Sequence, residues 1–310
     1  MRIVFFGSPA TAIPSLARLL SAGHRIELVI TQPDKPFGRG KKLKPCAVKT
    51  FALDKGLPHY ASERIRKDAA ALKKIREGEP EIIVVVAYGQ MIPLSIIDIP
   101  KYKSVNVHFS LLPKYRGASP VQWAVLNEET RTGVTIFRLN EKMDEGDILA
   151  AEEVAILPRE TALNLETRLS YIGAELLFKT LAVIERVRPT LQDHTQATYA
   201  PKLKKEDGLI DWAQDAEAVD RKVRAMTPWP SAYTFLHGRR IIIQEGQPSF
   251  EKAGQDSPGT IVSIEKYGIM VCCKDKSLYL IQTLRPENKK AMSAFSFSLG
   301  EHLKTSDGLG

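Results

Sequence analysis

The sequence has 310 residues, of which 44% are hydrophobic and 26% are charged, and its formal net charge is +8 at pH 7. No apolar run is long enough to span a bilayer, and three cysteines cannot form the framework of a disulfide-rich secreted domain, so both classes are excluded. A strand-like run starts at Arg2 and leaves no room for a signal or transit peptide. We therefore expect a cytoplasmic protein with reduced thiols and no membrane partner.

Residues 1–188 alternate short apolar runs with helical periodicity, which is typical of parallel βαβ units. The apolar runs predict strands at 2–6, 26–31, 81–87, 104–107 and 134–139. Periodicity and turn residues predict helices at 13–20, 45–55, 119–127 and 161–188. The first part of the chain is therefore predicted to be an α/β domain with an open, mostly parallel sheet.

The pattern changes at residue 189. Residues 189–207 lack periodicity and contain Pro and Lys, which predicts a linker. Beyond the linker, one helix is expected near 216–225, followed by short strands at 233–236, 240–244, 259–263, 269–273 and 278–283. Residues 208–310 are therefore predicted to form a small OB-like β-barrel domain.

The basic excess lies in the first two thirds of the chain. Residues 206–310 contain 13 Lys and Arg against 14 Asp and Glu, so residues 1–205 contain 31 against 22. Between Asp34 and Lys49, six basic residues accompany a single acid. A basic loop of this kind favours a polyanionic partner.

The residues most suggestive of chemistry lie between 104 and 147. Asn106 and His108 stand two apart at the carboxyl end of a predicted strand, so their side chains should point the same way into the crevice where open sheets bind ligands. A carboxamide and an imidazole there could stabilise a developing oxyanion. Asp144, on the loop after the next strand, could hold the histidine's tautomer and charge or order a water. From spacing alone, a structural histidine and an exposed acidic turn remain open.

Two other chemistries find little support in the sequence. No cluster of His, Cys and Asp has the spacing of a metal site, so we expect no metal. Gly7-Ser8-Pro9, the first turn, lacks the glycine fingerprint of dinucleotide-binding proteins, which makes an NAD-dependent oxidoreductase remote.

The run from Asn106 to Pro120, NVHFSLLPKYRGASP, resembles the signature of the folate-dependent formyltransferases, and Asp144-Glu-Gly-Asp147-Ile resembles their companion motif. The resemblance implies a Rossmann-like N-terminal formyltransferase domain with 10-formyltetrahydrofolate as cosubstrate. It implies that the catalytic residues are Asn106, His108 and Asp144. It implies that folate is bound by Ser110, Leu111, Leu112 and Pro113 on one wall and by Tyr88, Gly89, Gln90, Met91 and Ile92 on the other.

The formyl acceptor is indicated by the basic loop. Residues 34–45, DKPFGRGKKLKP, resemble the loop that enters the acceptor stem in the branch of the family that formylates initiator Met-tRNA. The resemblance implies this tRNA as partner and a tRNA-assisting C-terminal domain, although residues 206–310 are net acidic. We also expect a monomer. The tRNA-binding residues implied are Lys35, Arg39, Lys41, Lys42 and Lys44. A sugar-nucleotide formyltransferase and a catalytically silent RNA-binding protein are the alternatives.

Overall fold

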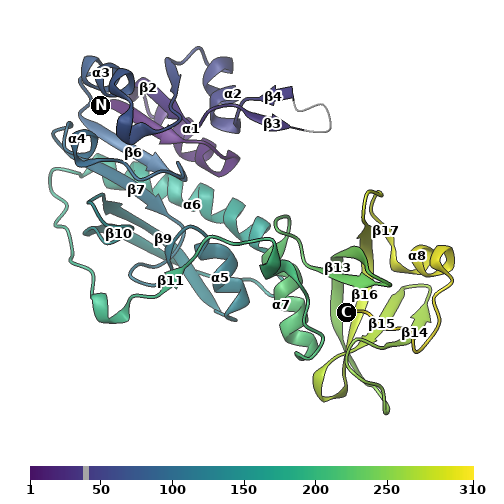
Figure 1. Cartoon of the computed structure of the whole chain (residues 1–310). Coiled ribbons are helices and arrows are strands. Elements are labelled where there is room, and N and C mark those ends of the chain that lie inside the picture. The colour runs from purple at the N-terminus through teal and green to yellow at the C-terminus, as the bar shows by residue number, and fades with distance from the viewer. Residues whose placement is uncertain (38–41) are drawn as a thin grey trace. The chain divides into compact units, whose positions relative to one another are not determined.

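The computed structural model describes residues 1–37 and 42–310, which divide into two compact units (Figure 1). The first unit comprises Met1–Pro120, Thr130–Ile156 and Leu165–Pro201. The second comprises Val121–Glu129, Leu157–Asn164 and Lys202–Gly310. Each unit is built around its own sheet.

The first unit contains a seven-stranded sheet of order β10-β9-β7-β6-β1-β2-β5. Its strands are β1 (Arg2–Gly7), β2 (Arg25–Thr31), β5 (His59–Ala61), β6 (Ile82–Val86), β7 (Ser104–His108), β9 (Arg131–Arg138) and β10 (Ile148–Ala155). The five strands from β7 to β5 run parallel, while β9 is antiparallel to both β7 and β10. Every residue of the central β6 is buried, as its continuous apolar run predicts.

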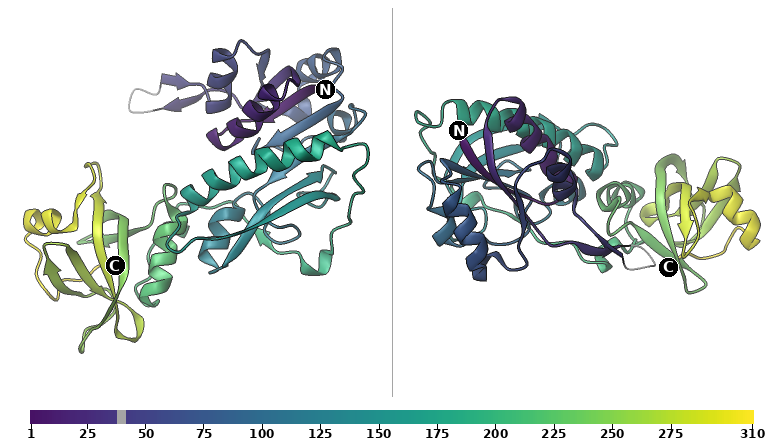
Figure 2. Two further views of the ribbon diagram at one scale, coloured as in Figure 1. Left: turned by 180° about the vertical axis from the view of Figure 1, so that it is seen from behind. Right: turned by 90° about the horizontal axis from the view of Figure 1, so that it is seen from above.

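Helices cover both faces of this sheet (Figure 2). They are α1 (Ile13–Ser21), α2 (Ala47–Asp54), α3 (Ala69–Glu77), α4 (Leu94–Ile97) and α6 (Ala162–Ala182). On one face, α3 and α4 enclose a hydrophobic cluster with alternate residues of β1 and β6, such as Phe6 and Val85. On the other face, Gly173 of α6 approaches Val107 and Val134 closely enough that a larger side chain would clash.

The second unit contains a six-stranded antiparallel sheet of order β12-β13-β16-β15-β14, with β17 paired to β16. Its strands are β12 (Tyr233–Leu236), β13 (Arg239–Lys252), β14 (Ile261–Glu265), β15 (Gly268–Cys272), β16 (Ser277–Pro286) and β17 (Met292–Ser293). Its helices are α5 (Pro120–Leu126), α7 (Ala216–Met226) and α8 (Ala294–Glu301). The predicted fold class, a mostly parallel α/β sheet followed by a small separate β domain, is confirmed.

The segment after α6 packs on the first unit as far as Pro201. Thr190 bridges to Ile148 at the start of β10. Farther on, β11 (Tyr199–Ala200) pairs in parallel with β8 (Arg116–Gly117). This part of the predicted linker region therefore lies beside the residues that the sequence motifs single out. Throughout the described residues, no helix combines the length and apolarity needed to cross a membrane.

Candidate functional site

Strand β7 presents Asn106 and His108 near its carboxyl end, between β6 and β9. The two residues are separated by one position, so they lie on the same face of the strand. His108 is 6% exposed, whereas Asn106 is partly accessible. The Asn106 carboxamide is therefore accessible to a ligand.

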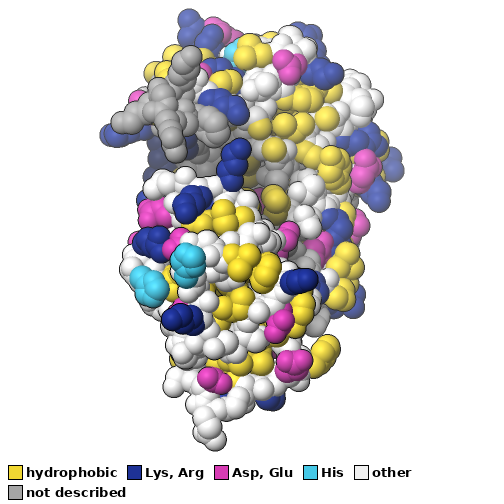
Figure 3. Space-filling view, turned by 90° about the vertical axis from the view of Figure 1, so that its right-hand side faces the viewer, with side chains coloured by type: hydrophobic (Ala, Val, Ile, Leu, Met, Phe, Trp, Pro, Cys, Tyr) yellow, Lys and Arg dark blue, Asp and Glu magenta, His cyan; other side chains and the backbone are white. Residues whose placement is uncertain are grey.

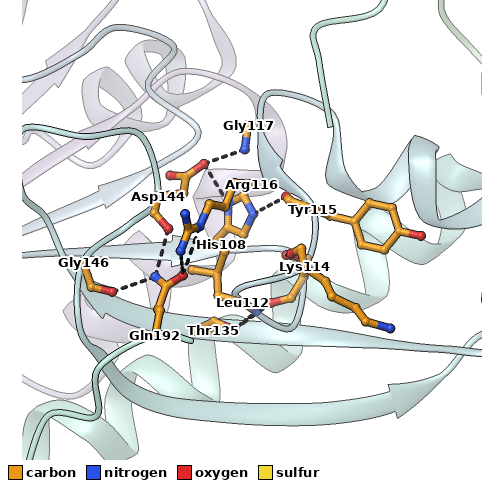
Figure 4. Close-up of polar contacts among 11 residues, drawn as sticks. His108, Leu112, Lys114, Tyr115, Arg116, Gly117, Thr135, Asp144, Gly146 and Gln192 are labelled. Atoms are coloured by element: carbon orange, nitrogen blue, oxygen red, sulfur yellow. Dashed lines mark hydrogen bonds and ion pairs between the residues drawn. The ribbon is translucent and has the colours of Figure 1, made fainter. Parts of the chain in front are cut away.

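Backbone geometry determines which nitrogen of His108 can act on a substrate (Figure 4). Nε2 lies 2.9 Å from the carbonyl oxygen of Tyr115. Because a carbonyl oxygen only accepts, Nε2 must carry the hydrogen and Nδ1 is left with its lone pair. Nδ1 faces Oδ2 of Asp144 at 3.8 Å, too far for a direct hydrogen bond but close enough for a strong charge interaction once the ring is protonated.

Asp144 is held in place by the segment that also orients His108. Its Oδ2 accepts a hydrogen bond of 2.8 Å from the backbone N–H of Gly117, and its side chain is 13% exposed. Glycine is required both at the residue that donates to Asp144 and two residues after Asp144. A Cβ on Gly117, whose φ is +116°, would lie 2.6 Å from the carbonyl oxygen of Ala200, and one on Gly146 would lie 1.7 Å from that of Arg138.

The Ser110–Pro113 turn is fastened to β9 by one buried side chain. The Thr135 hydroxyl donates to the carbonyl oxygen of Ser110 at 2.7 Å and accepts from the N–H of Leu112 at 3.1 Å. Ser110 is fully buried and its hydroxyl donates to the backbone of Lys114. The accessible members of the turn are the half-buried Leu111 and Pro113, which offer an apolar surface.

The other predicted folate wall, residues 88–92, is held in place by side chains that contact the rest of the first unit. Tyr88 and Ile92 are buried in the hydrophobic cluster of the first unit, and burial raises the pKa of Tyr88 to about 12. The Gln90 carboxamide is bonded to the backbone of residues between 62 and 65. These three side chains stabilise the loop, so a ligand would meet its more accessible members, Gly89 and Met91.

The basic loop forms a hairpin of β3 (Lys35–Phe37) and β4 (Lys42–Lys44). Lys35 lies directly opposite Lys44, and both are exposed. Of the other predicted contacts, Arg39 and Lys41 lie outside the described residues, and Lys42 is described by its backbone alone.

The second unit lacks a comparable concentration of charge. On the face of this unit turned toward the viewer in Figure 3, Lys and Arg are interspersed with Asp and Glu among uncharged groups. This agrees with the near balance of charges in residues 206–310. No group of three or more His, Cys, Asp or Glu residues is arranged to hold a metal ion in the part of the chain that the structure describes.

Besides Thr135, two further buried polar residues beside the site were not among the predicted ones. Arg116 is 1% exposed and Gln192 is 6% exposed. Arg116 stands inside the motif that begins at Asn106, so the motif offered a signal for it. Gln192 lies in a stretch without periodicity, and only the packing of that stretch on the first unit brings it to the site.

Both units match known protein families. The family described as "Formyl transferase" matches residues 1–181, and "Formyl transferase, C-terminal domain" matches residues 202–302. The chain is 42% identical over 312 residues to the methionyl-tRNA formyltransferase of Citrifermentans bemidjiense, with 100% of this chain and 96% of the relative covered. It is 41% identical over 312 residues to that of Geobacter metallireducens, with 100% and 99% covered.

A solved structure shares the fold. HypX from Aquifex aeolicus, in complex with tetrahydrofolic acid, is similar with a TM-score of 0.67 and 21% sequence identity. The similarity covers 98% of this chain and 48% of HypX, so this chain spans about half the length of that protein.

Proposed function

Since this chain belongs to the formyl transferase family, we propose that it transfers a formyl group from 10-formyltetrahydrofolate to the amino group of the methionine on initiator Met-tRNA. The product would be formylmethionyl-tRNA for translation initiation, which would place the enzyme in the cytoplasm. The observation that carries the proposal is the grouping of Asn106, His108 and Asp144, in which one imidazole nitrogen faces a fixed carboxylate. That grouping suits an acyl transfer that passes through an oxyanion.

The geometry assigns a separate role to each side chain. The Asn106 amide donates to the oxygen of the formyl group as it becomes negative. His108 acts through Nδ1, because Nε2 is engaged with the Tyr115 carbonyl. When Nδ1 takes the proton lost by the attacking amine, the resulting imidazolium is stabilised by Asp144 at 3.8 Å and can return the proton to the departing nitrogen.

The accessible residues near this group fit a folate. A pterin ring is flat, largely apolar on its faces and rich in donors and acceptors at its edge. The half-buried Leu111 and Pro113 supply an apolar surface, and the loop at Gly89 offers exposed backbone groups. We propose that these two segments hold the folate, with the formyl donor reaching Asn106 and His108.

The tRNA assignment is supported by the relatives and by the basic hairpin. Relatives at 41% and 42% identity over the full chain carry the name methionyl-tRNA formyltransferase. Lys35 and Lys44 lie directly opposite each other on the hairpin and are exposed, and exposed lysines of this kind contact nucleic-acid phosphates. We propose that Arg39, Lys41 and Lys42 extend this contact.

The proposed function is tested with the purified chain, 10-formyltetrahydrofolate and charged initiator tRNA. After hydrolysis of the aminoacyl bond, the methionine is separated and its mass determined. We expect N-formylmethionine to appear only when both substrates and the active enzyme are present. Unmodified methionine after prolonged incubation would refute the proposal, and uncharged tRNA serves as the control for reaction at other amines.

A further inference from the structure

The Asp144 turn (residues 144–146) depends on residues far away in sequence. The turn is part of the connection between β9 and β10 and lies outside both strands. Asp144 itself adopts a left-handed backbone conformation, with φ of 54°. The position of its carboxylate beside His108 therefore has to be fixed by contacts from outside the turn.

Gln192 supplies these contacts from the segment after α6 (Figure 4). Its Nε2 donates to the carbonyl oxygens of Asp144 at 2.9 Å and Gly146 at 2.7 Å. Its Oε1 accepts from Nε of Arg116 at 3.1 Å and from Nη2 at 2.7 Å. Both donors and both acceptor positions of the carboxamide are thus used, and the direction of the amide is determined because carbonyl oxygens only accept and a guanidinium only donates.

Arg116 also contacts the turn directly. Its Nη1 lies 3.5 Å from a carboxylate oxygen of Glu145. Arg116 is buried, and a buried guanidinium needs such partners; besides Glu145 it contacts Gln192 and Nδ1 of His194, the latter at 3.1 Å. Between them, Arg116 and Gln192 hold all three residues of the turn: the backbone of the first and third and the side chain of the second.

The same short segment also orients the catalytic histidine. Tyr115 accepts from His108 Nε2, and Gly117 donates to the Asp144 carboxylate. The Arg116 side chain, between these two backbone contacts, carries the connection to Gln192. Residues 115–117 therefore hold His108, Asp144 and the turn in position relative to one another.

We propose that Gln192, together with Arg116, is a positioning residue that keeps the Asp144 carboxylate aligned with Nδ1 of His108 during formyl transfer. The inference rests on the proposed function. In this role Gln192 contacts neither substrate. Its effect should therefore fall on kcat, because a displacement of about 1 Å of a reacting group is enough to lower the rate by about a hundredfold.

Two substitutions test this role. Gln192→Glu keeps an acceptor for Arg116 but turns a carboxylate toward the two carbonyl oxygens, whereas Gln192→Met removes the hydrogen bonds without adding charge. For both we expect kcat for Met-tRNA formylation to fall by about tenfold to a hundredfold, with the KM values of both substrates almost unchanged. The matched control is Gln196→Glu, the same change at an exposed position four residues on, which should retain wild-type kinetics.

Coupling to Asp144 separates positioning from a general loss of structure. In an Asp144→Asn background, Gln192→Glu should cause little further loss of kcat, since the group that it positions no longer acts. Thermal melting shows whether each variant is folded. If Gln192→Glu does not fold, Gln192→Met is compared in the wild-type and Asp144→Asn backgrounds instead.

The outcomes are distinct. Wild-type kcat in both Gln192 variants, a loss confined to KM, or an equal further loss in the Asp144→Asn background would overturn the positioning role while leaving the proposed function intact. A wild-type enzyme that does not formylate Met-tRNA would overturn the proposed function and this inference with it.

Discussion

Replacement of Asp144 by Asn isolates the charge of the proposed catalytic carboxylate. The amide oxygen of Asn can still accept from the Gly117 N–H, so the local structure should survive. What is lost is the attraction between a carboxylate and a protonated His108 ring 3.8 Å away. At an effective dielectric constant of about 20, two unit charges near this separation interact by about 4 kcal/mol. If the imidazolium is fully formed in the transition state, this corresponds to about a thousandfold in rate.

We therefore expect kcat of Asp144→Asn to fall by about a hundredfold to a thousandfold, with little change in melting temperature. Single-turnover formylation of Met-tRNA, with enzyme in excess, measures the chemical step directly. Asp98→Asn is the matched control, because it makes the same change in an exposed ion pair with Lys103. A near-wild-type single-turnover rate for Asp144→Asn would show that its charge is not used and would reduce Asp144 to a turn residue.

Two further predictions concern binding. Thr135→Val leaves the N–H and C=O that Thr135 bonds without partners, so it should lower the free energy of unfolding by about 1–3 kcal/mol and raise the KM for the folate. Thr180→Val, another buried threonine bonded within α6, should affect denaturant unfolding but not that KM. Replacing Arg39, Lys41 and Lys42 together by Ala should raise the KM for Met-tRNA and flatten its dependence on salt by at most about two to three units of log–log slope. An unchanged slope with full activity would remove the hairpin from the tRNA site.

The sequence predicted the elements that are buried along their whole length and missed some that lie at the edge of the sheet. Strand β6 was expected because residues 82–86 are all apolar and β-branched. Strand β10 was not, since ILAAEEVA contains Ala and Glu, which have low strand propensity, and it lies at the edge of the sheet. The long helix predicted over 161–188 ends earlier, at Ala182.

Within the candidate site, the sequence predicted the residues that share a local pattern better than those that only tertiary packing brings together. The spacing of Asn106 and His108 on one strand is local information, and it indicates a shared face directly. The approach of Asp144 depends on the order of β7 and β9 in the sheet, so spacing alone left it open and the motif resemblance supplied it. The role of Gln192 depends on where an aperiodic segment packs, for which the sequence offers no local pattern.

The choice of formyl acceptor distinguishes the proposed function from its alternatives. Under one set of conditions, kcat/KM is measured for formyl transfer from 10-formyltetrahydrofolate to initiator Met-tRNA, to free methionine and to an amino-sugar nucleotide. The proposed function predicts efficient transfer to Met-tRNA and very weak transfer to the other two, because only the tRNA can engage the basic hairpin. Transfer to the amino-sugar nucleotide with a higher kcat/KM than to Met-tRNA would contradict it.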